Sequence, residues 1–219
     1  MKQFLIALFF VLLLSLTGCT SMPGSNKVQG NGVAKTEKRD FPQFTSIEVN
    51  CPGVIHFTAQ EQKSLQISGD DNIVPLITAE VKNNTLYIKS NKDYDAKSKL
   101  QIDIANPDIE KFAFTGAGEA ALSKIQNERL EITVSGAGKL TASGETKEAD
   151  ISLTGAGNID AKDLHTIKTK VRSTGVGSID VYALDELDAN ATGVGNINYY
   201  GNPQHVNKQA TGIGKITQK

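Results

Sequence analysis

The sequence predicts an all-β fold, a single-stranded parallel β-helix (β-solenoid) whose coils are roughly 19 residues long. Three observations predict it: a Gly-x-Gly triplet that recurs six times, apolar residues that alternate with polar ones beside each triplet, and a composition with 20 glycines and 6% aromatic residues. Successive first glycines lie 20, 19, 20, 18 and 19 residues apart, at Gly116, Gly136, Gly155, Gly175, Gly193 and Gly212. A period this constant indicates stacked repeats, each burying its apolar edge against its neighbours.

Residues 1–18 are predicted to be a lipoprotein signal peptide. Lys2 precedes an apolar run, Phe4 to Leu16, which is shorter than the span of about 20 residues that a transmembrane helix needs. The run leads into Leu16-Thr17-Gly18-Cys19, which matches a bacterial lipobox. Cys19 is therefore the predicted lipidation site, where acyl chains such as palmitate would anchor the protein in a membrane. The alternative is an ordinary signal peptide with a chance cysteine.

Residues 19–38 are predicted to be a flexible tether, and residues 39–219 the folded domain. The tether is rich in Ser, Gly, Asn and Gln and has little apolar content to pack. Thr20 after Cys19 is compatible with sorting to the outer membrane, facing either the periplasm or the cell surface. Cys51 is the second of two cysteines, and we interpret it as a small buried residue rather than a reactive thiol.

The charge balance argues against a nucleic-acid partner. The chain has 23 basic and 24 acidic side chains, whereas nucleic-acid-binding domains carry a basic excess. After the signal peptide there is no further apolar run of membrane-spanning length, so the lipid is the expected membrane attachment.

The region before the triplets is also predicted to form strands, in irregular first coils of the same domain. Alternating or β-rich segments are separated by turn residues such as Cys51-Pro52-Gly53 and Asn83-Asn84. The charged segment Lys89 to Lys99 is predicted to be a loop. The expected strands are Phe44 to Val49, Val54 to Thr58, Ser64 to Ser68, Thr85 to Ser90 and Leu100 to Ile104.

Each repeat is predicted to be a strand, a Gly-x-Gly corner, a second strand and a variable return. After the triplet, one apolar position recurs in every unit, at Ala120, Leu140, Ile159, Ile179, Ile197 and Ile216. We expect the last four to form one interior stack, and we expect glycine at the corners because it tolerates positive φ. Where the residue two before the triplet shrinks, as at Ser173, the middle of the triplet grows, as at Val176. This predicts that these two positions share one interior space.

Three sequence features together resemble a known family. They are Phe41-Pro42-Gln43-Phe44-Thr45-Ser46-Ile47-Glu48-Val49, then Asn84-Thr85-Leu86-Tyr87-Ile88, and the repeated Gly-x-Gly-x-Ile-(Asn/Asp), as in Gly195-Asn196-Ile197-Asn198. The chain resembles the putative autotransporter-adhesin head domain, called the GIN domain, over approximately Arg39 to Ile216. The resemblance implies a right-handed parallel β-helix and an envelope location, and it supplies no catalytic residues.

Two polar rows are the candidate functional residues. A hydroxyl precedes every triplet, at Thr115, Ser135, Thr154, Thr174, Thr192 and Thr211; we expect it mainly to hydrogen-bond between coils, although such a row could also bind a polysaccharide. The second row is a possible surface ladder: Ala121, Thr141, Asp160, Asp180, Asn198 and Thr217. Asp160 and Asp180 could bind Ca²⁺ or form an acid/base pair, but the strand pattern favours a solvated face.

No other cofactor or catalytic signature is recognised. His56, His165 and His205 occupy different parts of the repeat without metal-ligand spacing, and neither a phosphate loop nor a Gly-x-Ser-x-Gly elbow is present. The sequence favours a non-catalytic, lipid-anchored binding or structural protein, adhesin-like, whose partner would be a glycan or an envelope protein. The alternative is a β-helical polysaccharide-processing enzyme, which rests on fold analogy alone. Against it, Arg129 and Arg172 are the only arginines after Arg39.

Overall fold

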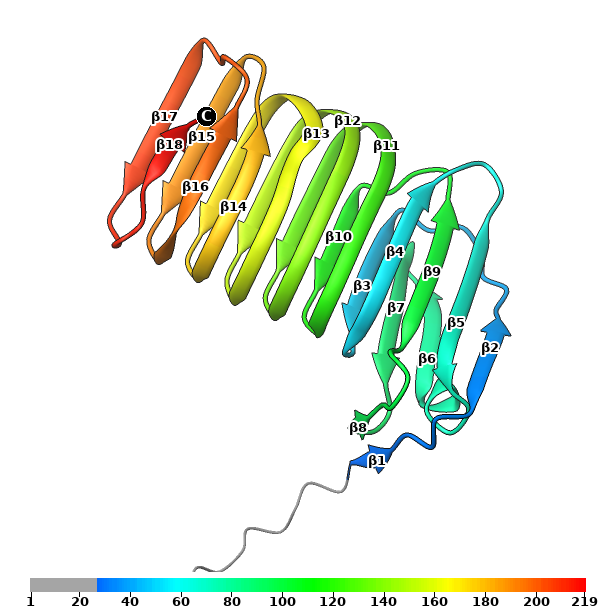
Figure 1. Cartoon of the computed structure of the whole chain (residues 1–219). Coiled ribbons are helices and arrows are strands. Elements are labelled where there is room, and N and C mark those ends of the chain that lie inside the picture. Colours follow the sequence, from blue (N-terminus) through cyan, green and yellow to red (C-terminus); the bar gives the residue numbers. More distant parts are fainter. Residues whose placement is uncertain (1–26) are drawn as a thin grey trace, which may run out of the picture.

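The computed structural model describes residues 27–219; the predicted signal peptide and Cys19 lie outside the described residues. The fold is all-β, a β-solenoid of stacked parallel coils, as the repeat predicts. Figure 1 shows the coils stacked side by side, from β17 and β18 at one end to β2, β5 and β6 at the other.

Two parallel sheets run along the solenoid. We call them the pre-corner sheet and the post-corner sheet, because their strands precede and follow the Gly-x-Gly corners. The long strands β11, β12 and β13 bend and contribute to both. The pre-corner sheet contains, in spatial order, β7 (Thr85–Ser90), β3 (Ser46–Asn50), β10 (Lys111–Phe114), the second halves of β11 (Ala117–Val134), β12 (Ala137–Leu153) and β13 (Ala156–Ser173), β15 (Glu186–Ala191) and β17 (His205–Ala210). The post-corner sheet contains β9 (Gln101–Asn106), β4 (Gly53–Ala59), the first halves of β11, β12 and β13, β14 (Val176–Tyr182), β16 (Val194–Tyr200) and β18 (Ile216–Gln218).

Antiparallel strands close the N-terminal end. β6 (Ile77–Lys82) covers β7, while β5 (Ser64–Asp70) covers β9 and β2 (Ala34–Lys38) covers β5. A short 3-10 turn, Val74–Leu76, joins β5 to β6. Chain order and spatial order differ here, because the first coil, β3 and β4, lies between the later strands β7 and β9 and the regular coils. The five strands expected in this half are confirmed to within a few residues, whereas the antiparallel cover was not anticipated.

The tether predicted over residues 19–38 differs from the structure in its second half. β1 (Val28–Gln29) pairs in parallel with β8 (Tyr94–Asp95), and Ala34–Lys38 is the strand β2. The buried carboxylate of Asp70 holds this segment, accepting hydrogen bonds from the backbone N–H groups of Gly32, Lys97 and Ser98 at 3.1, 2.8 and 3.2 Å. Because the bonds use backbone donors, the polar composition of residues 28–38 carried no signal of them.

The predicted interior stack is confirmed. Ile159, Ile179, Ile197 and Ile216 are direct partners on consecutive parallel strands. The first three are at most 1% exposed, while Ile216, in the last coil, is partly buried. Lys208 occupies the equivalent of an interior position on β17, and it is exposed, as expected for the terminal coil.

The corners need glycine mainly because neighbouring coils approach closely, rather than because of positive φ. A Cβ placed on Gly155 would lie 1.9 Å from the carbonyl oxygen of Gly136. Positive φ occurs in the second glycine of two triplets, Gly118 (142°) and Gly177 (141°). The expectation based on φ is therefore correct for a minority of the corners.

The expectation that the middle of the triplet shares interior space is wrong. Val176, Val194 and Ile213 point outward and are 58%, 51% and 82% exposed, whereas Ser173 and Ala191 are buried. In the coils where the pre-corner position shrinks to Ser173 and Ala191, a buried post-corner position grows from Ala161 to Val181 and Tyr199, which are register partners. We infer that they keep the interior filled at constant packing density.

Candidate functional site

A row of polar side chains, interrupted at Ala121, runs along the outer face of the post-corner sheet. The strand register places Thr141, Asp160, Asp180, Asn198 and Thr217 side by side on consecutive strands. In the other direction the row continues through Ala121 to His56 on β4 and Asp103 on β9. We call these eight residues the polar strip. Its seven intervals of about 4.8 Å give it a length of about 34 Å.

The two central carboxylates of the polar strip, Asp160 and Asp180, each have a side-chain partner. Lys162 Nζ lies 2.6 Å from Asp160 Oδ2, and Asn198 Nδ2 donates to Asp180 Oδ1 at 2.6 Å. Asp160 and Asp180 are register partners on adjacent strands, as expected, and each carboxylate has a side-chain partner of its own. The side chain of Asp160 is 30% exposed, so it remains within reach of solvent.

The extension of the strip to His56 and Asp103 could not be predicted from the repeat, because these residues lie before the triplets. His56 Nδ1 lies 2.9 Å from Asp103 Oδ1, and the two side chains are 45% and 36% exposed. Such a pair could orient an imidazole for proton transfer. However, the neighbours of this pair are not arranged for such a reaction. The next residue along the strip is Ala121, which has no polar side chain. The hydroxyls of Thr58 and Ser123 hydrogen-bond to each other, and Ser123 also donates to the Phe57 carbonyl.

A flanking row, two residues earlier on the same strands, broadens the polar face. It consists of Val54, Glu119, Lys139, Asn158, Ser178 and Asn196, again in register. Some of its amide side chains cap backbone groups of the next coil: Asn158 Oδ1 accepts from the Ser178 N–H at 2.9 Å, and Asn196 Oδ1 from the Lys215 N–H at 3.1 Å. Strip and flanking row together give a flat face with hydrogen-bonding groups at a regular spacing.

The hydroxyl row before the triplets lies exposed along the corner. Its expected bonding between coils is observed: Thr115 and Ser135 hydroxyls lie 3.3 Å apart, and Thr174 and Thr192 donate to carbonyl oxygens of the preceding coil at 3.5 Å. The row is thus partly engaged in holding the stack together, and its members stay solvent-exposed.

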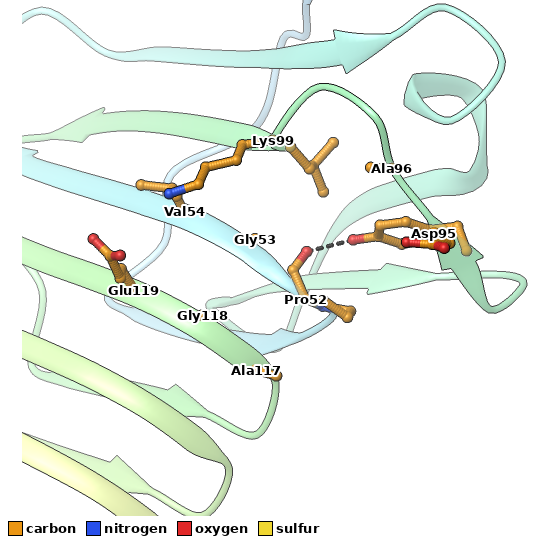
Figure 2. Close-up of a pocket in the computed structure, with 11 residues that line it drawn as sticks. Pro52, Gly53, Val54, Asp95, Ala96, Lys99, Ala117, Gly118 and Glu119 are labelled. Carbon is orange, nitrogen blue, oxygen red and sulfur yellow. Dashed lines mark hydrogen bonds between the residues drawn. The ribbon is translucent and has the colours of Figure 1, made fainter. Parts of the chain in front are cut away.

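Two hollows lie where the segment 89–99, which we call the strap, crosses the first corner. One has a volume of about 290 Å³ and lies against Val54, Leu100 and Ala117, with Lys99 and Glu119 on either side of Val54 (Figure 2). Tyr94 lines both hollows, and its hydroxyl donates to the carbonyl of Pro52. Burial raises the pKa of Tyr94, so that it stays a neutral donor.

The second hollow has a volume of about 540 Å³ and is lined by lysines. Lys27, Lys89 and Lys92 surround it, and its floor is formed by Thr115, Gly116, Ala117, Gly136 and Ala137. Cys51 also borders it but is 2% exposed, as interpreted from the sequence, and burial raises the pKa of its thiol to about 12. The thiol is therefore protonated and unreactive at neutral pH.

The three histidines lie on separate strands, His56 on β4, His165 on β13 and His205 on β17. His165 stacks on Tyr182, with ring centroids 4.6 Å apart. Within residues 27–219 no group of three or more His, Cys, Asp or Glu side chains is placed to hold a metal ion. In the same range no helix is long and apolar enough to cross a membrane.

The architecture is that of a β-solenoid domain with a polar, repeated surface, and comparison with known proteins identifies its family. Residues 43–203 match the model of the family described as "Putative auto-transporter adhesin, head GIN domain", and the chain belongs to this family. A putative adhesin from Bacteroides fragilis NCTC 9343 is 26% identical, with a TM-score of 0.72 over 88% of this chain and 100% of that one.

Two further crystal structures share the fold. A putative adhesin from Parabacteroides merdae ATCC 43184 is 19% identical, with a TM-score of 0.57 over 88% of this chain and 99% of the other. A putative lipid binding protein from Parabacteroides distasonis ATCC 8503 is 23% identical, with a TM-score of 0.55 over the same shares. No curated protein matches the sequence.

Proposed function

We propose that this protein is a lipid-anchored, non-catalytic binding domain of the bacterial outer membrane, and that it binds glycans in the manner of an adhesin. The polar strip is the observation that carries the proposal. It presents donors and acceptors about every 4.8 Å on a sheet that the interior stack keeps rigid, and this suits an extended polymer with many hydroxyl groups.

Membership of an adhesin-head family supports the adhesin-like role, and the lipobox supports the anchor. The enzyme alternative would use Asp160 and Asp180 as an acid/base pair. Asp160 is paired with Lys162 and Asp180 with Asn198, which suits a static surface better than proton transfer. We therefore favour the binding function over the catalytic alternative.

Binding can be tested with purified full-length protein and a panel of neutral and acidic polysaccharides. Asp180→Ala/Asn198→Ala is expected to weaken glycan binding about tenfold, because one or two hydrogen bonds of about 1 kcal/mol each are lost. Thr133→Ala/Ser152→Ala is a matched control, since these polar residues are register partners facing outward on the pre-corner sheet. Turnover of a polysaccharide that Asp160→Asn or Asp180→Asn abolishes would instead establish an enzyme.

The anchor has its own test. Cys19→Ala is expected to give a soluble or unprocessed form, whereas the parent protein fractionates with membranes. A variant that is processed and membrane-bound like the parent would refute lipidation. Protease treatment of intact cells then reports the leaflet, because an adhesin has to be accessible from outside.

A further inference from the structure

The lysine-lined hollow is built from non-repeating segments that meet at a corner of the solenoid. Lys27 precedes β1, Lys89 lies in β7 and Lys92 lies in the strap, yet all three converge over the corner at Thr115 and Gly116. The later Gly-x-Gly corners are not flanked by these three lysines. The hollow is thus a specific site added to the repeat.

The charge of the hollow is strongly unbalanced. Asp93 is the one carboxylate in its lining, against three ammonium groups. Within residues 27–219, none of the three lysines has a carboxylate oxygen within 4.0 Å, and the nearby Glu80 is paired with Lys82 at 2.6 Å. Concave surfaces lined by one sign of charge focus the electrostatic potential and concentrate oppositely charged ligands.

The floor offers uncharged donors beside these cations. The Thr115 hydroxyl is exposed, and in the part of the chain that the structure describes the backbone N–H groups of Gly116 and Gly136 reach no acceptor. Ammonium groups, a hydroxyl and backbone N–H groups together are the donor set that binds carboxylate, sulfate or phosphate.

The walls of the hollow are held in place before any ligand arrives. The Val28 N–H donates to the Asp93 carbonyl at 2.9 Å, and the Gly30 N–H to the Asp95 carbonyl at 2.8 Å. Tyr94 is bonded to Pro52, and the Asp70 carboxylate fixes the far end of the strap at Lys97 and Ser98. Such preorganisation lowers the entropy lost on binding.

We propose that this hollow binds an acidic group carried by a polysaccharide, and this inference rests on the glycan-binding function proposed above. The hydroxyl row leaves the hollow at Thr115 and Ser135 and gives a polymer a polar path along the corner. An anionic lipid would instead need an apolar exit for its acyl chains. None of the exposed large hydrophobic side chains among the described residues lines the hollow.

The test compares polygalacturonate, dextran sulfate and neutral dextran, with full-length protein in a neutral detergent. Lys89→Gln/Lys92→Gln is expected to weaken binding of the acidic polymers about tenfold, through loss of charge-assisted hydrogen bonds, and to leave dextran binding unchanged. Lys124→Gln/Lys170→Gln removes the same charge from exposed lysines elsewhere and should have little effect. Far-UV circular dichroism verifies that both variants are folded.

Each other outcome overturns the proposal. Equal losses in both variants would mean diffuse charge attraction, and an unchanged Lys89→Gln/Lys92→Gln would mean that the hollow is not the site. Lysine-dependent binding to anionic phosphatidylglycerol vesicles, without binding to the acidic polymers, would assign the hollow to lipid. If the polar-strip variant alone loses binding, the proposed function stands while this inference fails; if the parent binds no polysaccharide, both fail.

Discussion

The two halves of the solenoid use the same stacked architecture in different ways. In the regular coils, from Lys111 onward, most buried strand positions have an apolar register partner on the next coil, and polar groups form long rows. In the first half, the chain order is rearranged, antiparallel strands close the end, and segments far apart in sequence meet. Repetition thus supplies a rigid, uniform surface, whereas a site with a distinctive combination of side chains is found where repetition stops.

The close stacking of corners in the regular coils gives the largest expected effect. Gly155→Ala places a Cβ 1.9 Å from the Gly136 carbonyl oxygen, so backbone must shift in two coils. We expect a loss of about 4 kcal/mol or more in the free energy of unfolding, measured by urea denaturation. Ala156→Val is the control, because Ala156 is exposed and its register partner is already valine. A well-tolerated Gly155→Ala would show that spacing does not explain the glycines.

The interior stack gives the next effect and separates middle from terminal coils. Ile179 is fully buried, and Ile179→Ala is expected to cost about 2–5 kcal/mol through lost burial and a residual cavity. Ile216→Ala removes the same atoms from a partly buried position in the last coil, so its cost should be clearly smaller. Equal losses would mean that the two coils are packed alike.

The corner glycines and the interior stack also show how much could be predicted from the sequence. Periodic glycines and alternating apolar residues were enough for the fold, the register of Ile159 to Ile216 and the neighbouring positions of Asp160 and Asp180. Their signals are local, because a repeat places the same residue type at the same point of every coil. The lysine-lined hollow depends on residues 27, 89, 92 and 115 meeting around one cavity, and no local sequence pattern encodes that. The inclusion of β1 and β2 in the fold was missed for the same reason.

The irregular half can be probed through Asp70, which ties the strap to the segment before β2. Burial raises the pKa of this carboxyl, but hydrogen bonds from Ser98, Lys97 and Gly32 outweigh it and hold the pKa below its usual 3.8. A lowered folded-state pKa stabilises the protein above the unfolded value, and this contribution disappears as the pH falls through the folded value.

We therefore expect Asp70→Asn to lower the melting temperature at neutral pH and to show a shallower loss of stability on acidification below about pH 4 than the parent. Thermal melts across this pH range provide the measurement, and Asp40→Asn, which changes an exposed carboxylate, is the control. The same variant should also make the strap more sensitive to protease. Parallel pH curves for parent and Asp70→Asn would mean that this carboxylate does not stabilise the capped end.

The smallest expected effect is that of a substitution in the middle of a triplet. It tests whether the middle residue or a buried strand residue fills the interior of the regular coils. If the middle of each triplet filled the interior, Val194→Ala would leave a cavity and cost as much as a core truncation. Val194 is 51% exposed, so we expect a change within about 0.5 kcal/mol in the free energy of unfolding. Val181→Ala removes the same two methyl groups from a fully buried position, and its expected cost is about 2 kcal/mol. Urea denaturation of the two variants under identical conditions measures the difference, and comparable losses would restore the interior role of the triplet. A large gap would instead show that the corner side chains are free to vary, and that Val181 helps to fill the interior.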